Sequence, residues 1–215
     1  MKTQDLIDNG QKYIMNTYKY NPIVMDRGDG CYLYDTNNKE YLDFVSGIAV
    51  NSLGYGNLEF IKNLSHQILK LNHCSNLYWN QPQIELAELL IENSDFDKVF
   101  FCNSGAESVE AALKLCRKYG KQTKGNDCYE IITMKNSFHG RTLGAITSTG
   151  QEKYQKNFTP LLPGIKYAEF NNFNSILENI SEKTCAVLIE PIQGEGGIKP
   201  ASQDFLSNLR NICTE

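Results

Sequence analysis

The sequence predicts an α/β fold with a mainly parallel sheet and flanking helices. Strand-like and helix-like runs alternate through most of the chain after residue 50, which is typical of a parallel sheet. A length of 215 residues is enough for one large domain, or for one domain with an appendage. We expect residues 1–50 to form an N-terminal segment of a small domain, and residues 51–215 to form the first part of a larger domain.

The N-terminal segment is expected to hold a helix and a β-hairpin. The helix covers residues 5–18, and Pro22 prevents it from continuing. Two runs at 31–35 and 40–44 flank a turn at 36–39, which is the pattern of a hairpin.

The larger domain is expected to begin with two helices and to continue with alternating strands and helices. Apolar residues at helical spacing, and apolar runs of strand length, define these elements. In chain order they are helix 58–71, helix 83–93, strand 99–102, helix 108–119, strand 129–134, strand 186–190 and helix 202–213.

The last predicted helix has an apolar stripe with no strand after it. The stripe consists of Phe205, Leu206, Leu209, Ile212 and Cys213. A parallel sheet normally continues with another strand after such a helix. We therefore expect the chain to end in the middle of an α/β domain, with this stripe exposed and the isolated chain poorly folded.

Composition argues against several classes of partner. The formal net charge is -4, which gives no basic surface for nucleic acid or for a membrane. No run of 18 apolar residues and no apolar signal core is present, so we expect no membrane association. Seven scattered cysteines without a C-x-x-C pair indicate neither a disulfide framework nor a zinc site, and favour reduced thiols in the cytoplasm.

Residues 103–107, Asn-Ser-Gly-Ala-Glu, lie between a predicted strand and a predicted helix. Ser104 and Glu107 have the S-x-x-E spacing of a capping box, so an ordinary capped helix start is one interpretation. Gly105 and Ala106 favour the other interpretation, an anion site, because small residues at a helix start let a phosphate approach the backbone N–H groups. Both remain open for this segment, the Ser104 turn.

Residues 137–142, the Arg141 loop, directly follow the strand predicted at 129–134. Open α/β sheets bind ligands at the carboxyl ends of their strands. Phe138 can cover a flat cofactor, and Arg141 can bind a carboxylate with two N–H groups. A packed phenylalanine and a solvated arginine are the alternative, and we expect His139 to hydrogen-bond within the loop rather than to bind a metal.

Residues 190–197, the Glu190 loop, follow the strand predicted at 186–190. The loop contains two carboxylates, Glu190 and Glu195, and three glycines, which is also the composition of a mobile surface turn. Glu190 follows an apolar strand, and a carboxylate at the edge of a core usually has a partner. A surface turn and a functional loop are equally supported by these residues.

Taken together, the three segments resemble the class III, pyridoxal-phosphate-dependent aminotransferases. Residues 103–107, 137–142 and 190–197 match that family in order and spacing, and residues 26–44 resemble its N-terminal hairpin. Residues 75–83 are most similar to the branch that acts on N-acetylornithine. The resemblance implies fold type I, with a mainly parallel sheet, flanking helices and an N-terminal segment of the small domain.

The resemblance implies a cofactor site for pyridoxal 5'-phosphate. Gly105 and Ala106 would offer backbone N–H groups to the phosphate, with Ser104 nearby. Phe138 would stack on the pyridine ring.

The resemblance also implies a substrate site. Arg141 would bind the α-carboxylate, and Tyr18 would contact the substrate. Glu195 matches a glutamate that pairs with a distant arginine and helps the site switch between two substrates. Glu190 would support the cofactor pocket.

The family's main catalytic groups have no match in this chain. The Schiff-base lysine, the aspartate that pairs with the pyridine nitrogen and a phosphate-binding threonine lie, in the family, beyond the last helix predicted here. Lys166, Lys183 and Lys199 match none of them. We therefore assign no catalytic residue and no metal ligand, and expect the 215 residues alone to be inactive.

The activity implied for the complete enzyme is transamination in arginine biosynthesis. N-acetylornithine and 2-oxoglutarate would give N-acetylglutamate semialdehyde and glutamate, in a cytoplasmic homodimer. The alternatives within the family use ornithine or succinylornithine. An alternative of another class is a catalytically dead fragment, or a cofactor-binding remnant without the Schiff-base lysine.

Overall fold

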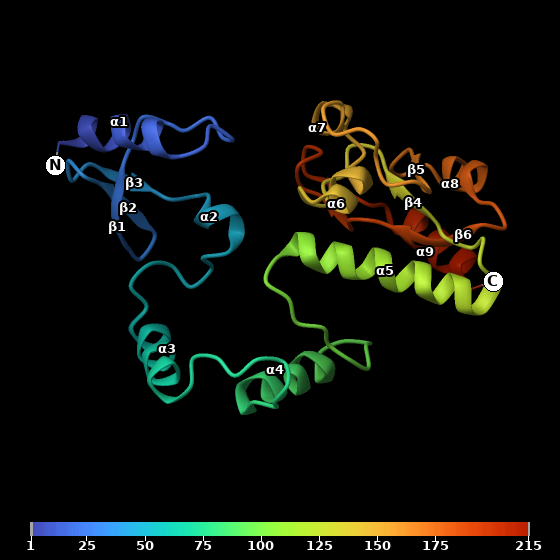
Figure 1. Cartoon of the computed structure of the whole chain (residues 1–215), viewed down its shortest axis with the longest axis horizontal. Helices are drawn as coiled ribbons and strands as arrows, with labels where there is room; N and C mark the ends of the chain where they lie inside the picture. Colours follow the sequence, from blue (N-terminus) through green and yellow to red (C-terminus); the bar gives the residue numbers. More distant parts are fainter. Residues whose placement is uncertain (1, 215) are drawn as a thin grey trace. The chain divides into compact units, whose positions relative to one another are not determined.

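The computed structural model describes residues 2–214, and its contacts group the chain into two compact units, Met1–Leu86 and Ala87–Glu215 (Figure 1). This division lies further along the chain than the boundary expected at residue 50. The assignment of 1–50 to a small domain and of 51–215 to a large domain stays a prediction.

The first unit contains a three-stranded antiparallel sheet in the order β1-β2-β3. The elements that begin in this unit are α1 (Thr3–Tyr13), β1 (Met25–Asp29), β2 (Tyr32–Asp35), β3 (Glu40–Leu42), α2 (Ser46–Ala49), α3 (Leu58–Lys70) and α4 (Gln81–Glu92). The predicted hairpin is confirmed as β2 and β3. Asp35 closes its turn, because its Oδ1 accepts hydrogen bonds from the backbone N–H groups of Asn37 (2.8 Å) and Lys39 (3.0 Å).

Two local predictions in this unit were wrong. The first helix ends at Tyr13, and Ile14 is already extended with φ -99° and ψ 132°. The hairpin was expected to consist of the runs at 31–35 and 40–44, but β1 adds a third strand that runs to Asp29 and pairs with β2. Such a strand depends on its neighbour more than on the local sequence.

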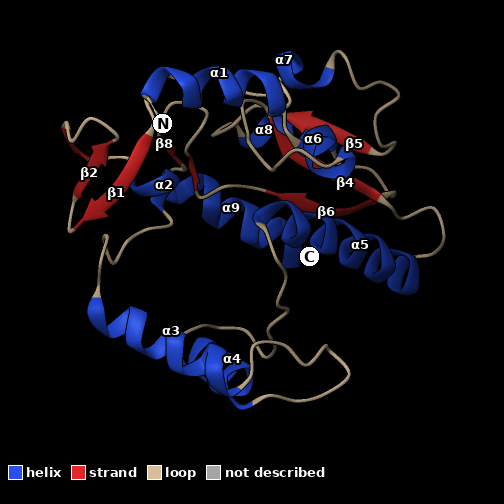
Figure 2. Ribbon diagram, turned by 60° about the vertical axis from the view of Figure 1, so that its left-hand side comes forward, coloured by secondary structure: helices blue, strands red, loops and turns tan. Residues whose placement is uncertain are grey.

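The second unit is a parallel α/β sheet with helices on both faces (Figure 2). Its elements are α5 (Gly105–Lys124), β4 (Glu130–Met134), α6 (Leu143–Ser148), α7 (Glu152–Gln155), β5 (Ile165–Ala168), α8 (Phe173–Asn179), β6 (Thr184–Leu188), β7 (Ile192–Gln193), β8 (Lys199–Pro200) and α9 (Gln203–Thr214). β4 lies between β5 and β6 and is parallel to both. This confirms the predicted fold class.

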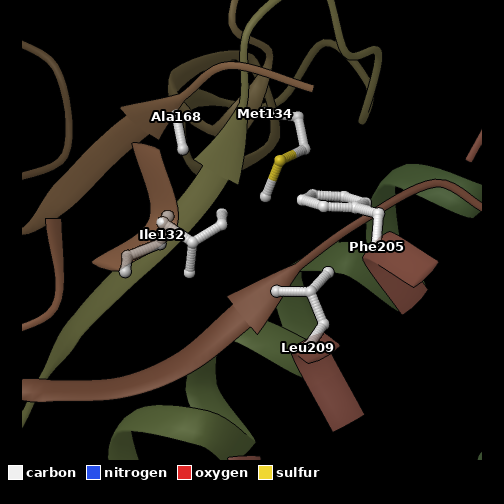
Figure 3. Packing of buried hydrophobic residues seen from close by; sticks show 6 residues of the cluster. Ile132, Met134, Ala168, Phe205 and Leu209 are labelled. Atoms are coloured by element: carbon white, nitrogen blue, oxygen red, sulfur yellow. The ribbon is translucent and has the colours of Figure 1, made fainter. Parts of the chain in front are cut away.

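The two faces of β4 pack against different helices, because successive side chains in a strand point to opposite sides. Ile132 and Met134 belong to a buried cluster with Ile176 of α8 and with Phe205 and Leu209 of α9 (Figure 3). On the other face, α6 lies against α5. The hydroxyl of Thr133 in β4 donates a hydrogen bond to the backbone carbonyl of Ser148 in α6. The sheet is therefore sandwiched between α8/α9 and α5/α6.

The apolar stripe of α9 is largely covered, contrary to the expectation, although Cys213 at its end is exposed. Phe205 is 2% exposed and Leu209 is 6% exposed, and both pack in the cluster that contains Ile132 and Met134 of β4. The reason is that β4, β5 and α8 already provide an apolar surface on which the stripe packs. The expectation that the whole stripe is exposed is therefore wrong, whereas the expectation that the isolated chain is poorly folded stays a prediction.

The strand predicted at 99–102 is also absent among the residues that the structure describes. A strand requires a hydrogen-bonded neighbour, and none of the described strands pairs with this segment. The segment instead leads into α5, which begins three residues earlier than predicted and runs five residues further.

Candidate active site

The Ser104 turn is a capping box. Ser104 Oγ accepts a hydrogen bond from the backbone N–H of Glu107 (3.2 Å), and the Glu107 carboxylate accepts one from the backbone N–H of Asn103 (2.6 Å). The backbone N–H groups of Gly105 and Ala106 have no acceptor among residues 2–214. A Cβ on Gly105 would meet nothing within 4 Å. The capped helix start therefore still offers two free donors and open space to an anion.

The Arg141 loop lies directly against this turn. Gly140 has φ +127°, and a Cβ there would lie 2.9 Å from the Cβ of Ala106 and 3.0 Å from that of Ala145. Only glycine fits a backbone of this conformation at so close an approach. Two segments that are more than thirty residues apart in sequence thus meet at one point.

Arg141 is exposed and lies over two aromatic rings. Its Cζ is 4.7 Å from the ring centre of Phe138 and 4.2 Å from that of Tyr154. The two rings meet edge to face, with centres 6.3 Å apart. No carboxylate pairs with Arg141 in the described part of the chain. The rings hold the guanidinium in place while its N–H groups remain available to an anionic ligand.

His139 belongs to a buried polar network beneath the loop, with partners outside the loop rather than within it as predicted. Its Nε2 lies 3.2 Å from Thr133 Oγ1, and its backbone N–H donates to Thr149 Oγ1 (2.9 Å). Burial lowers the pKa of His139 from 6.5 to about 4, so the imidazole is neutral at pH 7. No cluster of potential metal ligands is found in residues 2–214.

The Glu190 loop packs against the Arg141 loop. Glu190 Oε2 accepts a hydrogen bond from the backbone N–H of Phe138 (3.1 Å). Burial, and to a lesser extent the charge of Glu195, raise the pKa of Glu190 above its ordinary value. The partner predicted for Glu190 is therefore a backbone amide of the neighbouring loop.

Gln193 joins the same two loops. Its side chain is 1% exposed and donates from Nε2 to the backbone carbonyl of Lys135 (2.9 Å). A Cβ on Gly196 would lie 2.7 Å from the backbone carbonyl oxygen of Asn136. These contacts anchor the loop at Gln193 and Gly196, whereas Glu195 itself is exposed.

Tyr18 belongs to the first unit, where it is 67% exposed and meets Tyr20 edge to face at 6.3 Å. Its predicted role in substrate binding stays a prediction.

Lys166 and Lys199 lie in β5 and β8, and the amine of Lys166 pairs with Glu130 (2.7 Å).

Three residues that contribute to this arrangement were missed or left without a role in the sequence analysis: Glu110, Tyr154 and Gln193. Glu110 follows Ala106 by four residues and shares its helix face, but this spacing gives no signal of a contact with the Arg141 loop. Tyr154 and Gln193 likewise had no signal, because only the fold brings them to the loop.

The three loops thus meet at one edge of the second unit, where β4 and β6 end. This arrangement places a turn that can bind an anion, an aromatic ring and an arginine side by side. The fold is that of the parallel α/β proteins, and in this class ligands bind at the carboxyl ends of the strands, so this edge is the candidate site.

Comparison with known proteins defines the family. Residues 13–215 match the model of the class III aminotransferases, and the chain belongs to that family. It is 52% identical over 205 residues to an acetylornithine aminotransferase of Clostridium acetobutylicum. The matched residues make up 95% of this chain and 53% of that protein. A mitochondrial acetylornithine aminotransferase of Debaryomyces hansenii is 50% identical over 94% of this chain and 45% of its own length.

Solved structures agree with this assignment. The ornithine aminotransferase of Toxoplasma gondii superposes with a TM-score of 0.93 and 28% identity, over 100% of this chain and 51% of that one. An aminotransferase of Bacillus anthracis superposes with a TM-score of 0.90 and 26% identity, over 100% of this chain and 54% of that one. The fold is therefore that of the fold-type I aminotransferases, and this chain spans about half the length of its relatives.

Among residues 2–214, no helix is both long enough and apolar enough to cross a membrane.

Proposed function

We propose that the second unit binds pyridoxal 5'-phosphate at the junction of the three loops. The observation that supports this most is the pair of free N–H groups at Gly105 and Ala106, next to Gly140 of the loop that carries Phe138. Ser104 has its Oγ in the capping box, so its hydroxyl hydrogen can still be donated to a phosphate oxygen. The residues present fit the phosphate and the ring of this cofactor.

Each side chain then has a distinct task. The cofactor supplies an aldehyde for the substrate amine and a ring that withdraws electrons from the reacting carbon. Phe138 covers the ring, and Glu190 holds the backbone of Phe138 in place. Arg141 binds the α-carboxylate of the substrate through its free N–H groups, while Tyr18 and Glu195 complete the recognition of the substrate. Pyridoxal-phosphate chemistry also needs a lysine, and no residue of this chain is assigned that task.

The reaction that we propose for the complete enzyme is transamination of N-acetylornithine with 2-oxoglutarate. It yields N-acetylglutamate semialdehyde and glutamate, a step in arginine biosynthesis. Relatives about 50% identical to this chain bear the name acetylornithine aminotransferase, which supports this substrate. We further propose a homodimer in the cytoplasm, which acts on these small molecules and not on nucleic acid.

Arg141→Lys in the whole protein that carries these residues tests the proposal. Lysine keeps the charge but loses the planar pair of N–H groups, so KM for N-acetylornithine and 2-oxoglutarate should rise on the order of 100-fold. Arg210→Lys on the exposed surface of α9 is the matched control and should leave both values unchanged. Equal kinetics for Arg141→Lys and the unaltered protein would contradict the role of Arg141.

Substrate choice and cofactor binding need separate measurements. Parallel assays with N-acetylornithine, ornithine and N-succinylornithine should show the highest kcat/KM for N-acetylornithine; preference for another donor would refute this choice. The 215 residues alone should give no turnover with any of them, and turnover would refute the assignment of the lysine to a residue outside this chain. Binding of the cofactor by this chain, followed by its visible absorbance, would separate a cofactor-binding remnant from a fragment that does not bind.

A further inference from the structure

The carboxylate of Glu110 connects helix α5 with the segment that follows Arg141. Its Oε1 accepts hydrogen bonds from the backbone N–H groups of Gly144 (3.0 Å) and Ala145 (3.3 Å), and from the hydroxyl of Thr142. A Cβ on Gly144 would lie only 2.6 Å from this oxygen. The carboxylate therefore caps the first turn of α6 from another helix.

A second contact from the same helix face holds the other side of Arg141. Ala106 precedes Glu110 by four residues, so both lie on one face of α5. Ala106 packs against Gly140, the residue before Arg141, while Glu110 binds Thr142, the residue after it. One helix thus fixes both chain neighbours of the arginine.

Helix α5 also begins at the Ser104 turn. The distance between the free N–H groups of that turn and the backbone of Arg141 is therefore set within a single rigid element. We propose that Glu110 is a positioning residue, which holds Arg141 at the spacing from the Ser104 turn that a substrate carboxylate requires. This inference rests on the proposed function of Arg141.

The chemistry of the contact explains why a carboxylate is needed. One oxygen accepts hydrogen bonds from three donors, and an ionised oxygen accepts them more strongly than a neutral amide oxygen does. Its negative charge also lies at the start of α6, where backbone N–H groups point outward. Glutamine at position 110 keeps the size of the side chain but weakens all three hydrogen bonds.

The test measures binding without turnover. Calorimetry with glutarate, a dicarboxylate without a keto group, gives its dissociation constant for the whole cofactor-loaded protein. Glu110→Gln should raise this constant about 10-fold, because a small misplacement of a binding group is costly. Arg141→Gln should raise it on the order of 100-fold. Adding Glu110→Gln to Arg141→Gln should change it by less than about two-fold, since the two residues act through one another.

Controls separate positioning from a general loss of structure. Glu178→Gln removes an exposed carboxylate of α8 and should leave glutarate binding unchanged. Thr142→Val removes the hydroxyl that donates to Glu110 and that also accepts a hydrogen bond from the backbone N–H of Ala145 (3.4 Å). It leaves the Glu110 carboxylate on Gly144 and Ala145, and should give a smaller rise than Glu110→Gln. In both Glu110→Gln and Thr142→Val, the affinity for pyridoxal 5'-phosphate should be unchanged, because the N–H groups of the Ser104 turn are untouched.

Three results would overturn the proposal. The first is unaltered glutarate binding in Glu110→Gln. The second is that Glu110→Gln raises the dissociation constant of glutarate by the same factor in the unaltered protein and in Arg141→Gln. A parallel loss of cofactor affinity and thermal stability in Glu110→Gln would reduce Glu110 to a structural role. If Arg141→Gln itself leaves glutarate binding unchanged, the proposed function of Arg141 fails as well, which distinguishes the two failures.

Discussion

The α-carbon of Gly140 lies so close to Ala106 that a β-carbon on Gly140 would come within 2.9 Å of the Ala106 methyl group. The two residues belong to different loops at the carboxyl edge of the sheet. Their contact brings the Ser104 turn beside Phe138 and Arg141, and the candidate site depends on it.

Gly140→Ala should separate these loops. The new methyl group overlaps Ala106 and Ala145, and φ +127° is unfavourable for any residue with a β-carbon. Overpacking of this kind costs about 1–3 kcal/mol in free energy of unfolding. Urea denaturation measures the loss, with Gly105→Ala as the control, because a Cβ at Gly105 meets open space. Equal stability of the two variants would show that the close approach of Gly140 has no energetic weight.

His139 should make the protein sensitive to mild acid. Its pKa is about 4 in the folded state against 6.5 as an ordinary value, so the folded protein favours the neutral imidazole. The stabilisation is complete above pH 6.5 and is lost as the pH falls from 6.5 to about 4, because only the unfolded chain takes up the proton in that range. The loss amounts to at most about 3 kcal/mol.

His139→Gln removes this titration and keeps a side chain that can hydrogen-bond to Thr133. Its stability should fall less between pH 6.5 and 4 than that of the unaltered protein, as measured by chemical denaturation at several pH values. His73→Gln, at an exposed histidine, is the control and should follow the unaltered protein. The same pH dependence in all three proteins would argue against a buried neutral His139.

Glu190→Gln should stabilise the protein at neutral and higher pH. Burial raises the pKa of Glu190, so its ionised form is less favourable in the folded state than in the unfolded chain. Glutamine removes that charge, and its amide oxygen can still accept the hydrogen bond from Phe138. The gain should be largest at pH values above the raised pKa of Glu190, and should disappear as the pH falls below the ordinary glutamate value, where Glu190 is neutral in both states.

Thermal unfolding at pH 8 and pH 4 measures this difference. Glu178→Gln is the matched control, since it removes a carboxylate that is exposed. A gain in Glu190→Gln that is independent of pH would show that burial of the charge is not its cause.

The sequence predicted the parallel sheet and the position of the Arg141 loop and the Glu190 loop after strands, and it gave the capping box at Ser104 as one of two interpretations. These features depend on neighbouring residues, such as the apolar spacing of a helix or the pairing of Ser104 with Glu107. The strand expected at 99–102 depends instead on a partner strand, and no described strand pairs with it. Strand β5 was missed for the complementary reason, since its pairing with β4 defines it.

By itself, the sequence determined the residue types of the candidate site: small residues at Gly105 and Ala106, an aromatic ring at Phe138 and a cation at Arg141. Only the tertiary structure decided how they are held. Ala106 with Gly140, and Glu110 with Thr142, are pairs separated by more than thirty residues. Such contacts leave no local pattern, because they form only when the packing of α5 on the sheet brings the two segments together.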